Sequence, residues 1–456
     1  MLTNKNIKKI YLFFISSHMI LWVLVPALSN ANLPLDTIEA LAWGSNLDWG
    51  FNKHPPLSAF AAEVFYQIFG NKDWAYYFLS QIFVISAFTI ILILAYEIFQ
   101  DIKLAFISVI LLESIFFYNY TSPEFNVNVA QLPFWALSIY FTWRCLKHDK
   151  LLDYVFLGLF ISLGILSKYL FLYLALSIKL LFIYNIYKTK KFSFKIFIPG
   201  FISLIVLFPH ILWLIENDFV TIAYGFQRAE GLGNSLDHII SPTIFILKQI
   251  GILIPFFILF SFLKNKFKYK KNNLDERKIF LIFLFLIPIV FVIFTSIILG
   301  AKIRTMWMTP FYLLIGIFFI EFLGKNLKFA DLKKFYFFFM VFFIASPLSY
   351  LIVSLSNEYK RTDYPGSEIA RLVQNKWDEN FRNEIKIVVG DEWFAGNLSY
   401  HLSSRPKWIQ ELGEKTPNLK INHGVVYTGN PKILKKICPG VFGTIKPVGY
   451  CMIGQK

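Results

Sequence analysis

Long apolar runs alternate with short polar connections along most of the chain. Most runs are close to the roughly 17 to 25 residues that an α-helix needs to cross a bilayer. They predict eleven membrane-spanning helices, at residues 10–28, 75–98, 104–119, 126–144, 153–167, 169–187, 195–215, 243–263, 279–299, 307–323 and 335–355. The first run follows Lys5, Lys8 and Lys9 and could pass for a signal peptide. We expect it to be retained as a helix, because nothing else would anchor the polar segment after it.

The pattern changes after about residue 355. Apolar runs become short, as at 385–389 and 424–427, and Gly and Pro separate them, which is typical of a small soluble α/β domain. We therefore expect a membrane part at residues 1–355, with a large outside loop at 29–74, and a soluble part at residues 356–456. Cys438 and Cys451 both lie in the soluble part, and we expect them to pair if that part faces an oxidising compartment.

Composition and charge support a membrane protein and suggest its orientation. Hydrophobic residues make up 56% of the chain, and mean hydropathy is +0.54. The net charge of +16 is carried in short Lys/Arg runs between apolar segments, which argues against nucleic-acid binding. With eleven spans, every basic cluster falls on one side: Lys103; Arg144, Lys147 and Lys150; Lys188, Lys190, Lys191 and Lys195; the run 264–271; and Lys325, Lys328, Lys333 and Lys334. The positive-inside rule then places the N-terminus inside and residues 356–456 outside.

The first outside loop holds the richest set of polar residues. Its segment 36–56 reads DTIEALAWGSNLDWGFNKHPP, with carboxylates and cations at Asp36, Glu39, Asp48, Lys53 and His54. Asp36 and Glu39 are three residues apart and would share one face of a helix. Two interpretations stay open at this point. The segment could be an amphipathic interfacial element with its tryptophans at headgroup depth, or it could form a reaction site.

Four other outside segments also carry candidate residues. These are Glu124 in S-P-E-F-N, Lys168 in G-I-L-S-K-Y, Arg228 in the loop 216–238, and Lys302, Arg304 and Trp307 in G-A-K-I-R-T-M-W. Lys168 stands between two apolar helices. It could instead be an interfacial lysine that reaches toward lipid headgroups.

The pattern D-x-x-E-A, W, L-D-W-G and K-H-P-P-L in the first loop resembles the bacterial membrane glycosyltransferases of the GT-C type. These are the relatives of protein mannosyltransferases and of the lipid A aminoarabinose transferase. Similar motifs at 121–126, 164–169 and 300–310 extend the resemblance over essentially the whole chain. It implies an all-α polytopic GT-C helical bundle of about 11 transmembrane helices with a small α/β periplasmic C-terminal domain. It also implies a multi-pass protein of the cell inner membrane with a cytoplasmic N-terminus.

The same resemblance implies a reaction and its substrates. The enzyme would transfer a sugar, such as the aminosugars aminoarabinose or galactosamine, from undecaprenyl phosphate to lipid A or a related glycolipid on the periplasmic face. A leaving phosphate needs cationic partners, and a carboxylate can stabilise the anomeric carbon or accept the acceptor's proton. The partners implied are therefore the lipid-linked sugar donor, the glycolipid acceptor and the bilayer.

The resemblance also implies roles for individual residues. The acid that opens the first-loop motif is the catalytic one, which implies Asp36 or Glu39, because this chain reads D-T-I-E-A where many relatives read D-E-A. Asp36 could also cap a helix, since Asp followed by Glu39 is close to a capping box. The donor phosphate would meet Lys53, His54, Lys168, Lys302 and Arg304. The substrates would also contact Asp48, Glu124, Trp307 and Arg228.

Metal dependence and two alternative functions stay open. Many relatives carry D-H-P-P where this chain carries K-H-P-P, and His54 has no second metal ligand at a recognisable spacing. The motifs therefore require no cofactor, although a divalent metal is not excluded. A lipid-linked sugar transporter or flippase would place charges near the bilayer midplane, whereas here they lie on one rim apart from residues such as Glu113. A protein O-mannosyltransferase-like enzyme would keep the chemistry and use a protein hydroxyl as acceptor.

Overall fold

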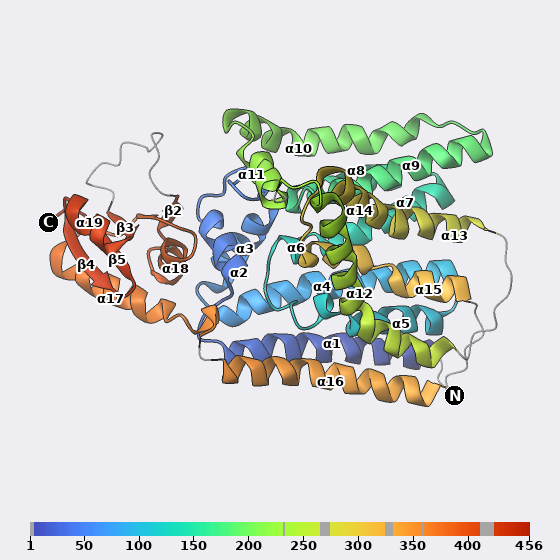
Figure 1. Cartoon of the computed structure of the whole chain (residues 1–456), viewed down its shortest axis with the longest axis horizontal. Coiled ribbons are helices and arrows are strands. Elements are labelled where there is room, and N and C mark those ends of the chain that lie inside the picture. The colour runs from blue at the N-terminus through green and yellow to red at the C-terminus, as the bar shows by residue number, and fades with distance from the viewer. Residues whose placement is uncertain (1–3, 231–232, 265–273, 324–331, 358, 411–423) are drawn as a thin grey trace.

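A bundle of long helices carries a small β-sheet at one end (Figure 1). The computed structural model describes residues 4–230, 233–264, 274–323, 332–357, 359–410 and 424–456. The main bundle helices are α1 (Asn4–Ser29), α4 (Asp73–Phe99), α7 (Leu132–His148), α8 (Leu151–Ser167), α9 (Phe171–Thr189), α10 (Ile198–Glu216), α12 (Asp237–Lys264), α14 (Ile287–Leu299), α15 (Ile315–Leu323) and α16 (Lys333–Ser356). The 3-10 turn η3 (Phe194–Phe197) leads into α10, and α13 (Glu276–Leu281) with the π-helical turn η4 (Ile282–Leu286) leads into α14.

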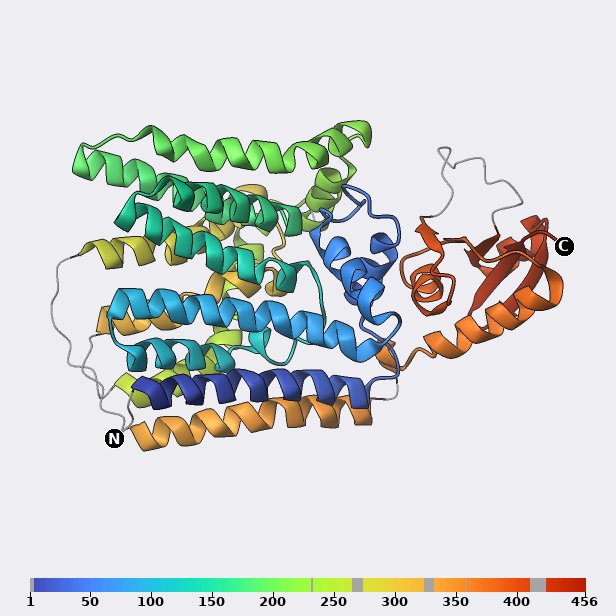
Figure 2. The same cartoon turned by 180° about the vertical axis from the view of Figure 1, so that it is seen from behind.

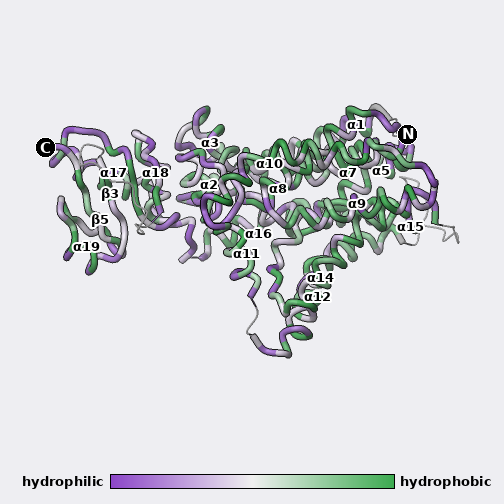
Figure 3. The backbone as a smooth tube through the Cα atoms, turned by 90° about the horizontal axis from the view of Figure 1, so that it is seen from above, coloured by the Kyte–Doolittle hydropathy of each residue, from purple (hydrophilic) through white to green (hydrophobic). Residues whose placement is uncertain are grey.

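Seven helices within the described ranges are long and apolar enough to cross a membrane. They are Asn6–Ser29, Asp73–Phe99, Phe171–Thr189, Phe194–Glu216, Asp237–Leu263, Glu276–Leu299 and Lys333–Ser356. A pair of helices bent by 55°, Thr305–Tyr312 and Ile315–Phe322, gives an eighth candidate. Hydrophobic residues follow these helices, as the green segments of Figure 3 show, and large apolar side chains such as Phe201 and Leu204 on α10 are exposed. The chain is thus a multi-pass membrane protein, as the apolar runs predict.

The other three predicted spans hold shorter helices. Span 104–119 contains α5 (Ile102–Ile110) and then the 3-10 turns η1 (Leu111–Ser114) and η2 (Phe116–Tyr118). Span 126–144 begins with the single turn α6 (Val127–Ala130) before α7, and span 153–167 is the 17-residue α8. The count of eleven membrane crossings therefore stays a prediction.

Two predicted basic clusters meet at the end of the bundle that holds the N-terminus (Figure 2). There Lys147 lies 2.8 Å from Glu276 at the start of α13, and Lys195 lies 2.8 Å from Asp149. The clusters 144–150 and 188–195 thus share one end of the molecule, as predicted. Residues 265–271 and Lys325 and Lys328 lie outside the described residues.

The opposite end of the bundle carries the first large loop and the sheet. Helices α2 (Leu35–Gly44) and α3 (Leu57–Phe69) lie between the bundle and the sheet (Figure 2). Helix α11 (Val220–Ala229) and the 3-10 helix η5 (Thr305–Tyr312) lie at the same end of the bundle.

The C-terminal residues form a mixed sheet with covering helices, in keeping with the predicted small α/β unit. The strands are β1 (Ile387–Val389), β2 (Lys407–Ile409), β3 (Val425–Gly429), β4 (Val441–Ile445) and β5 (Val448–Ile453), in the order β2-β1-β3-β5-β4. Strands β2, β1 and β3 are parallel, and β5 is antiparallel to β3 and β4. The remaining elements are η7 (Arg361–Asp363), α17 (Gly366–Asn380), α18 (Phe394–His401) and α19 (Pro431–Ile437). Cys438 forms a disulfide with Cys451 on β5, which confirms the predicted pairing.

Apolar residues of α2 and the following loop belong to the same core as the sheet. Trp43 and Phe51 stack at a centroid distance of 5.3 Å and pack in one cluster with Trp377 of α17. Gly396 on α18 allows close packing, because a Cβ there would lie 3.1 Å from side chains of Ile38 and Ala42. The sheet is therefore held directly against the segment that carries Asp36 and Glu39.

Candidate active site

Asp36 and Glu124 meet at the start of α2. The N-cap of α2 is Pro34, which makes no side-chain cap, and Asp36 lies inside the helix, so the capping role considered for Asp36 is wrong. Instead, Glu124 from the second outside loop accepts a hydrogen bond from the backbone N–H of Asp36 at 3.1 Å. No side chain in the described ranges hydrogen-bonds to the carboxylate of Asp36 itself. That carboxylate is therefore available to a substrate.

Burial and nearby charges have opposing effects on the pKa values of Asp36 and Glu124. Burial raises the pKa of Asp36, and four nearby cations lower it without cancelling the effect: Lys168, Lys53, Arg228 and Arg361. Burial, followed by the charge of Asp36, raises the pKa of Glu124 to about 8. Because two adjacent carboxylates repel each other, the pair tends to keep one proton near neutral pH. A carboxylate with a raised pKa is also a better proton acceptor.

Glu39 is already paired with a cation. Its carboxylate lies 2.5 Å from Lys53, and Lys53 lies 3.1 Å from Glu392 of the C-terminal part. Burial raises the pKa of Glu39 to about 7, against the lowering effect of Lys53. Of the two predicted catalytic acids, Glu39 therefore forms an ion pair with Lys53. The carboxylate of Asp36 accepts no side-chain hydrogen bond in the described residues.

His54 packs among aromatic rings. Its ring lies edge-on to Trp43 at 6.0 Å and to Tyr224 at 6.3 Å between centroids. Burial, assisted by nearby cations including Lys168, lowers the pKa of His54 to about 3, so the imidazole is neutral at neutral pH. A neutral imidazole can donate one hydrogen bond to a phosphate but supplies no charge.

Lys168 is buried inside the site. Its side chain donates a hydrogen bond to Asn128 at 2.6 Å and lies 5.0 Å from the ring centroid of Trp307. The residue is 4% exposed, so the interfacial interpretation of Lys168 is wrong. Burial lowers the pKa of Lys168 to about 7, while Asp36 raises it and Arg304 lowers it further. Trp307 and Lys168 thus come together, as their predicted roles require.

Three other predicted cations line a cavity beside this cluster. Arg228, Lys302 and Arg304 are exposed and contribute to the wall of a cavity of about 940 Å³. The backbone N–H of Lys302 donates to the carbonyl of Ala229 at 3.0 Å, which joins the segment 300–307 to α11. The charge of Arg228 lowers the pKa of Asp36, and that of Arg304 lowers the pKa of Lys168, so cations of the cavity act electrostatically on the cluster that holds Asp36.

Asp48 makes a local contact and, in the described ranges, none with another predicted site residue. It is exposed, and its carboxylate accepts a hydrogen bond from the backbone N–H of the next residue, Trp49, at 2.8 Å. This is a local turn contact of the kind that Asp commonly makes. The predicted substrate-binding role of Asp48 has no contact in the described residues that supports it.

Sequence reasoning missed two charged residues of the site. Glu392 follows strand β1 and contacts Lys53. Arg361 follows α16, and its charge lowers the pKa of both Asp36 and Glu124. A weak signal existed for both. Glu392 stands in an acidic pair directly after an apolar run, and Arg361 stands in a charged segment directly after the last apolar span. Within the described residues, no group of three or more His, Cys, Asp or Glu side chains is arranged to hold a metal ion.

The arrangement has a definite chemical capacity. An open carboxylate that faces cations, at the rim of a membrane-embedded bundle, suits an enzyme that transfers a group from a phosphate-bearing donor. The carboxylate can receive a proton, and the cations can stabilise the departing phosphate.

Comparisons with known proteins agree with this class. Residues 53–213 match the family of dolichyl-phosphate-mannose-protein mannosyltransferases. The crystal structure of ArnT from Cupriavidus metallidurans bound to undecaprenyl phosphate has the same fold, with a TM-score of 0.67 and 12% identity over 97% of each chain. The apo structure of that protein gives a TM-score of 0.64 and 10% identity, again over 97% of each chain. No curated protein sequence gives a significant match.

Residues 53–213 therefore resemble the protein mannosyltransferases, and the whole chain has the fold of ArnT, which together indicate a glycosyltransferase. This assignment does not support the transporter or flippase alternative.

Proposed function

We propose that this glycosyltransferase moves a sugar, such as an aminosugar, from undecaprenyl phosphate to lipid A or a related glycolipid. The observation that carries the proposal is the open carboxylate of Asp36 among the four cations named above, next to a basic cavity of about 940 Å³. The choice of donor is supported by the similar fold of ArnT, whose structure was solved with undecaprenyl phosphate bound.

Each group at the site has a task in the proposed reaction. The acceptor hydroxyl attacks the anomeric carbon, the bond from that carbon to the phosphate oxygen breaks, and the phosphate leaves with the electron pair. Asp36 accepts the hydroxyl proton or stabilises the positive charge that develops on the sugar. Lys168 and Arg228, whose charges reach Asp36, stabilise the leaving phosphate. Glu39 and Glu392 hold Lys53 in place beside them.

We also propose an organisation in the membrane. Residues 1–355 would form the catalytic membrane domain, with the loop 29–74 and residues 356–456 in the periplasm and the N-terminus in the cytoplasm. The grouping of two basic clusters at the N-terminal end of the bundle supports this orientation in the inner membrane. A reporter that is active only in the periplasm should work when fused after Lys456. Activity of a cytoplasmic reporter at that position instead would reverse the orientation.

Mass spectrometry of lipid A from cells with and without the protein tests the reaction. We expect one sugar-sized mass increment to disappear from lipid A when the protein is absent. Restoring the wild-type chain should restore the increment, whereas an Asp36→Asn chain should not. Unchanged lipid A in this comparison would exclude lipid A as the acceptor.

A protein hydroxyl is the second candidate acceptor. It is favoured by the family match over residues 53–213, since that family is described as transferring mannose to protein. The same pair of strains distinguishes the two candidates, because a protein acceptor would lose glycosylated peptides while lipid A keeps its mass.

A further inference from the structure

One face of helix α12 lines two adjoining cavities. Asp237, Ser241, Ile244 and Lys248 border the cavity of about 940 Å³. Lys248 also borders a second cavity of about 370 Å³, followed along the helix by Gly251 and Pro255. The spacing of these residues by three and four positions places them on one side of the helix. The face is polar at the end near the active site, cationic in the middle and apolar beyond.

Lys248 has no role in the site described above. It lies eleven residues from Asp237, and therefore about 16 Å along the helix from the end that borders the active site. A cation at this depth of a membrane-spanning helix is costly unless it meets an anion or water, so such a residue indicates function. No carboxylate in the described residues pairs with Lys248.

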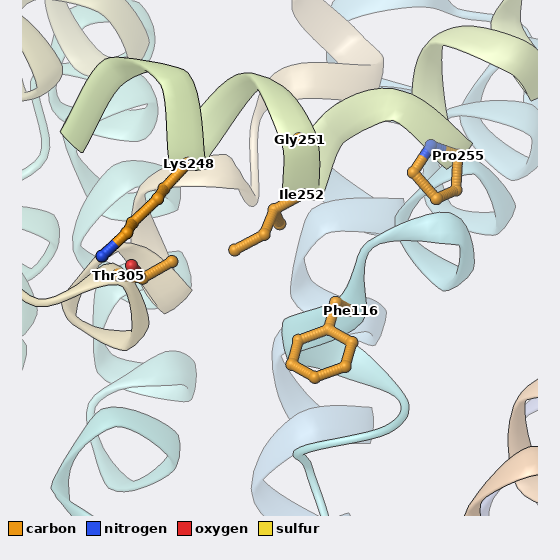
Figure 4. Close-up of a pocket in the computed structure, with 6 residues that line it drawn as sticks. All are labelled: Phe116, Lys248, Gly251, Ile252, Pro255 and Thr305. Carbon is orange, nitrogen blue, oxygen red and sulfur yellow. The ribbon is translucent and has the colours of Figure 1, made fainter. Parts of the chain in front are cut away.

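The two cavities meet at Lys248. Both are also lined by Phe116, Ile252 and Thr305. Figure 4 shows the side chain of Lys248 extending from α12 toward Thr305, with Phe116 across from Ile252. The larger cavity also carries Arg228, Lys302 and Arg304, whereas the smaller one has almost no other charge. A molecule that spans both cavities would need an anionic head, an apolar tail and a junction between them at Lys248.

We propose that Lys248 binds the phosphate of a lipid substrate, with the headgroup in the larger cavity and the first part of the tail in the smaller one. This inference rests on the proposed function and extends it. The phosphate belongs either to the polyprenyl donor or to a phosphorylated lipid acceptor, since both chemistries present an anion at the top of an apolar tail. Lys248 supplies the cation where the two cavities meet and so sets the position of the phosphate between them.

Gly251 allows the binding of the apolar tail to be tested separately from the binding of the phosphate. It lies one turn beyond Lys248, and a Cβ added at Gly251 would meet no atom within 4 Å. Gly251→Leu would therefore extend into the smaller cavity without a clash in the fold, and the change favours helix formation. Gly200 on α10 is equally open and lines neither cavity, so Gly200→Leu is the matched control.

The test measures equilibrium binding to the purified full chain in detergent micelles. The probes are undecaprenyl phosphate, undecaprenol, which lacks the phosphate, and dioleoyl phosphatidic acid. Lys248→Gln removes the charge, and Lys179→Gln on α9 is the control, because Lys179 is also an exposed lysine within an apolar helix. Thermal unfolding of each variant reports whether the fold is kept.

We expect Lys248→Gln to raise the Kd for undecaprenyl phosphate by about tenfold or more, the typical effect of losing a charge-assisted contact. Its Kd for undecaprenol should not change, and both control variants should bind as the wild type does. Gly251→Leu should weaken the binding of both polyprenyl probes. An effect of Lys248→Gln confined to phosphatidic acid would also support the proposal and would identify the acceptor as the phosphate source.

Equal binding of both lipid phosphates by wild type and Lys248→Gln would overturn the inference and leave the proposed function intact. Failure of the wild type to bind either lipid phosphate would overturn the inference together with the proposed donor class.

Discussion

The three carboxylates at the site differ in what they touch, and this difference separates their roles. Glu39 lies 2.5 Å from Lys53, and Glu124 accepts the backbone N–H of Asp36. Asp36 keeps its carboxylate open toward the surrounding cations. A group that has no protein partner can bind and release a substrate proton without first breaking an internal contact.

Asp36→Asn should lower sugar transfer by roughly two to four orders of magnitude, the range expected when a positioned acid–base or electrostatic group is lost. The fold should persist, because Asn has nearly the same size and Asp36 does not cap α2. The measurement is transfer by purified variants in proteoliposomes. Glu39→Gln is the control and should cost less, since Glu392 still holds Lys53. Near-normal turnover of Asp36→Asn with loss of activity in Glu39→Gln would move the catalytic role to Glu39.

Glu124 should set an alkaline limit to activity. Its pKa is raised to about 8, so the group is mostly neutral below this pH and becomes ionised above it. Ionisation adds a negative charge beside Asp36, which should repel the donor phosphate and lower kcat/KM as the pH rises through about 8. Glu124→Gln keeps an oxygen for the backbone N–H of Asp36 but cannot ionise. Its pH profile should therefore lack the alkaline decline, and a decline that persists in this variant would assign it to another group.

Buried polar contacts decide where helices stop inside the bundle. His18 on α1 lies 2.9 Å from Glu113 of η1 and 3.1 Å from Gln81 of α4, and Gln81 donates to Ser122 at 3.1 Å. The side chain of Asn119 donates to the backbone carbonyl of Glu113. These contacts connect three helical elements to the loop that delivers Glu124.

His18→Leu should destabilise the protein by about 1 to 3 kcal/mol, because it leaves the buried side chain of Glu113 without its polar partner. Replacing both residues by Leu should recover most of this loss, since no polar group of the pair is then buried without a partner. Unfolding of the purified protein by heat or denaturant in detergent provides the measurement. Tyr11→Phe on the same helix removes a half-buried hydrogen bond to Thr89 and should cost about 1 kcal/mol. A double variant as unstable as the single one would show that the contact between His18 and Glu113 is not the cause.

These contacts also explain how far the elements could be predicted. The apolar runs predict the long helices well, because a membrane demands continuous apolar sequence. The break after α5 was not predicted, because residues 104–119 read as a single span that Glu113 alone interrupts with a charge, and the partners of Glu113 and its neighbours come from α1 and α4. In the site, the motif resemblance indicated that the first loop carries reactive residues. The contact between Glu392 and Lys53 could not be predicted, because the two residues are 339 positions apart and no local pattern joins them.

At the scale of the whole molecule, the C-terminal part with the sheet and the helical bundle both contribute residues to the site. Arg405, near the end of α18, donates to the carbonyl of Leu41 on α2 and to Glu63 on α3, both at 2.6 Å. The same C-terminal part supplies Glu392 to Lys53 and the charge of Arg361 to Asp36. Docking of the sheet therefore fixes part of the electrostatics around the carboxylates.

Arg405→Met should loosen this docking and reduce transfer, although Arg405 does not contact the reacting groups. It would remove the cation that faces Glu63, whose side chain is only 6% exposed and would keep only its hydrogen bond from Gln67, and losing one partner of a buried pair costs about 3 kcal/mol. Displacement of Glu392 and Arg361 by about 1 Å should then lower turnover by roughly tenfold to a hundredfold. Faster proteolysis of residues 356–456 and slower transfer in proteoliposomes should appear together.

Lys376→Met is the control, because its ion pair with Glu379 on α17 is exposed and contributes little. Arg405→Met/Glu63→Met should regain docking and turnover together, and full transfer by Arg405→Met alone would mean that catalysis does not depend on the docked sheet.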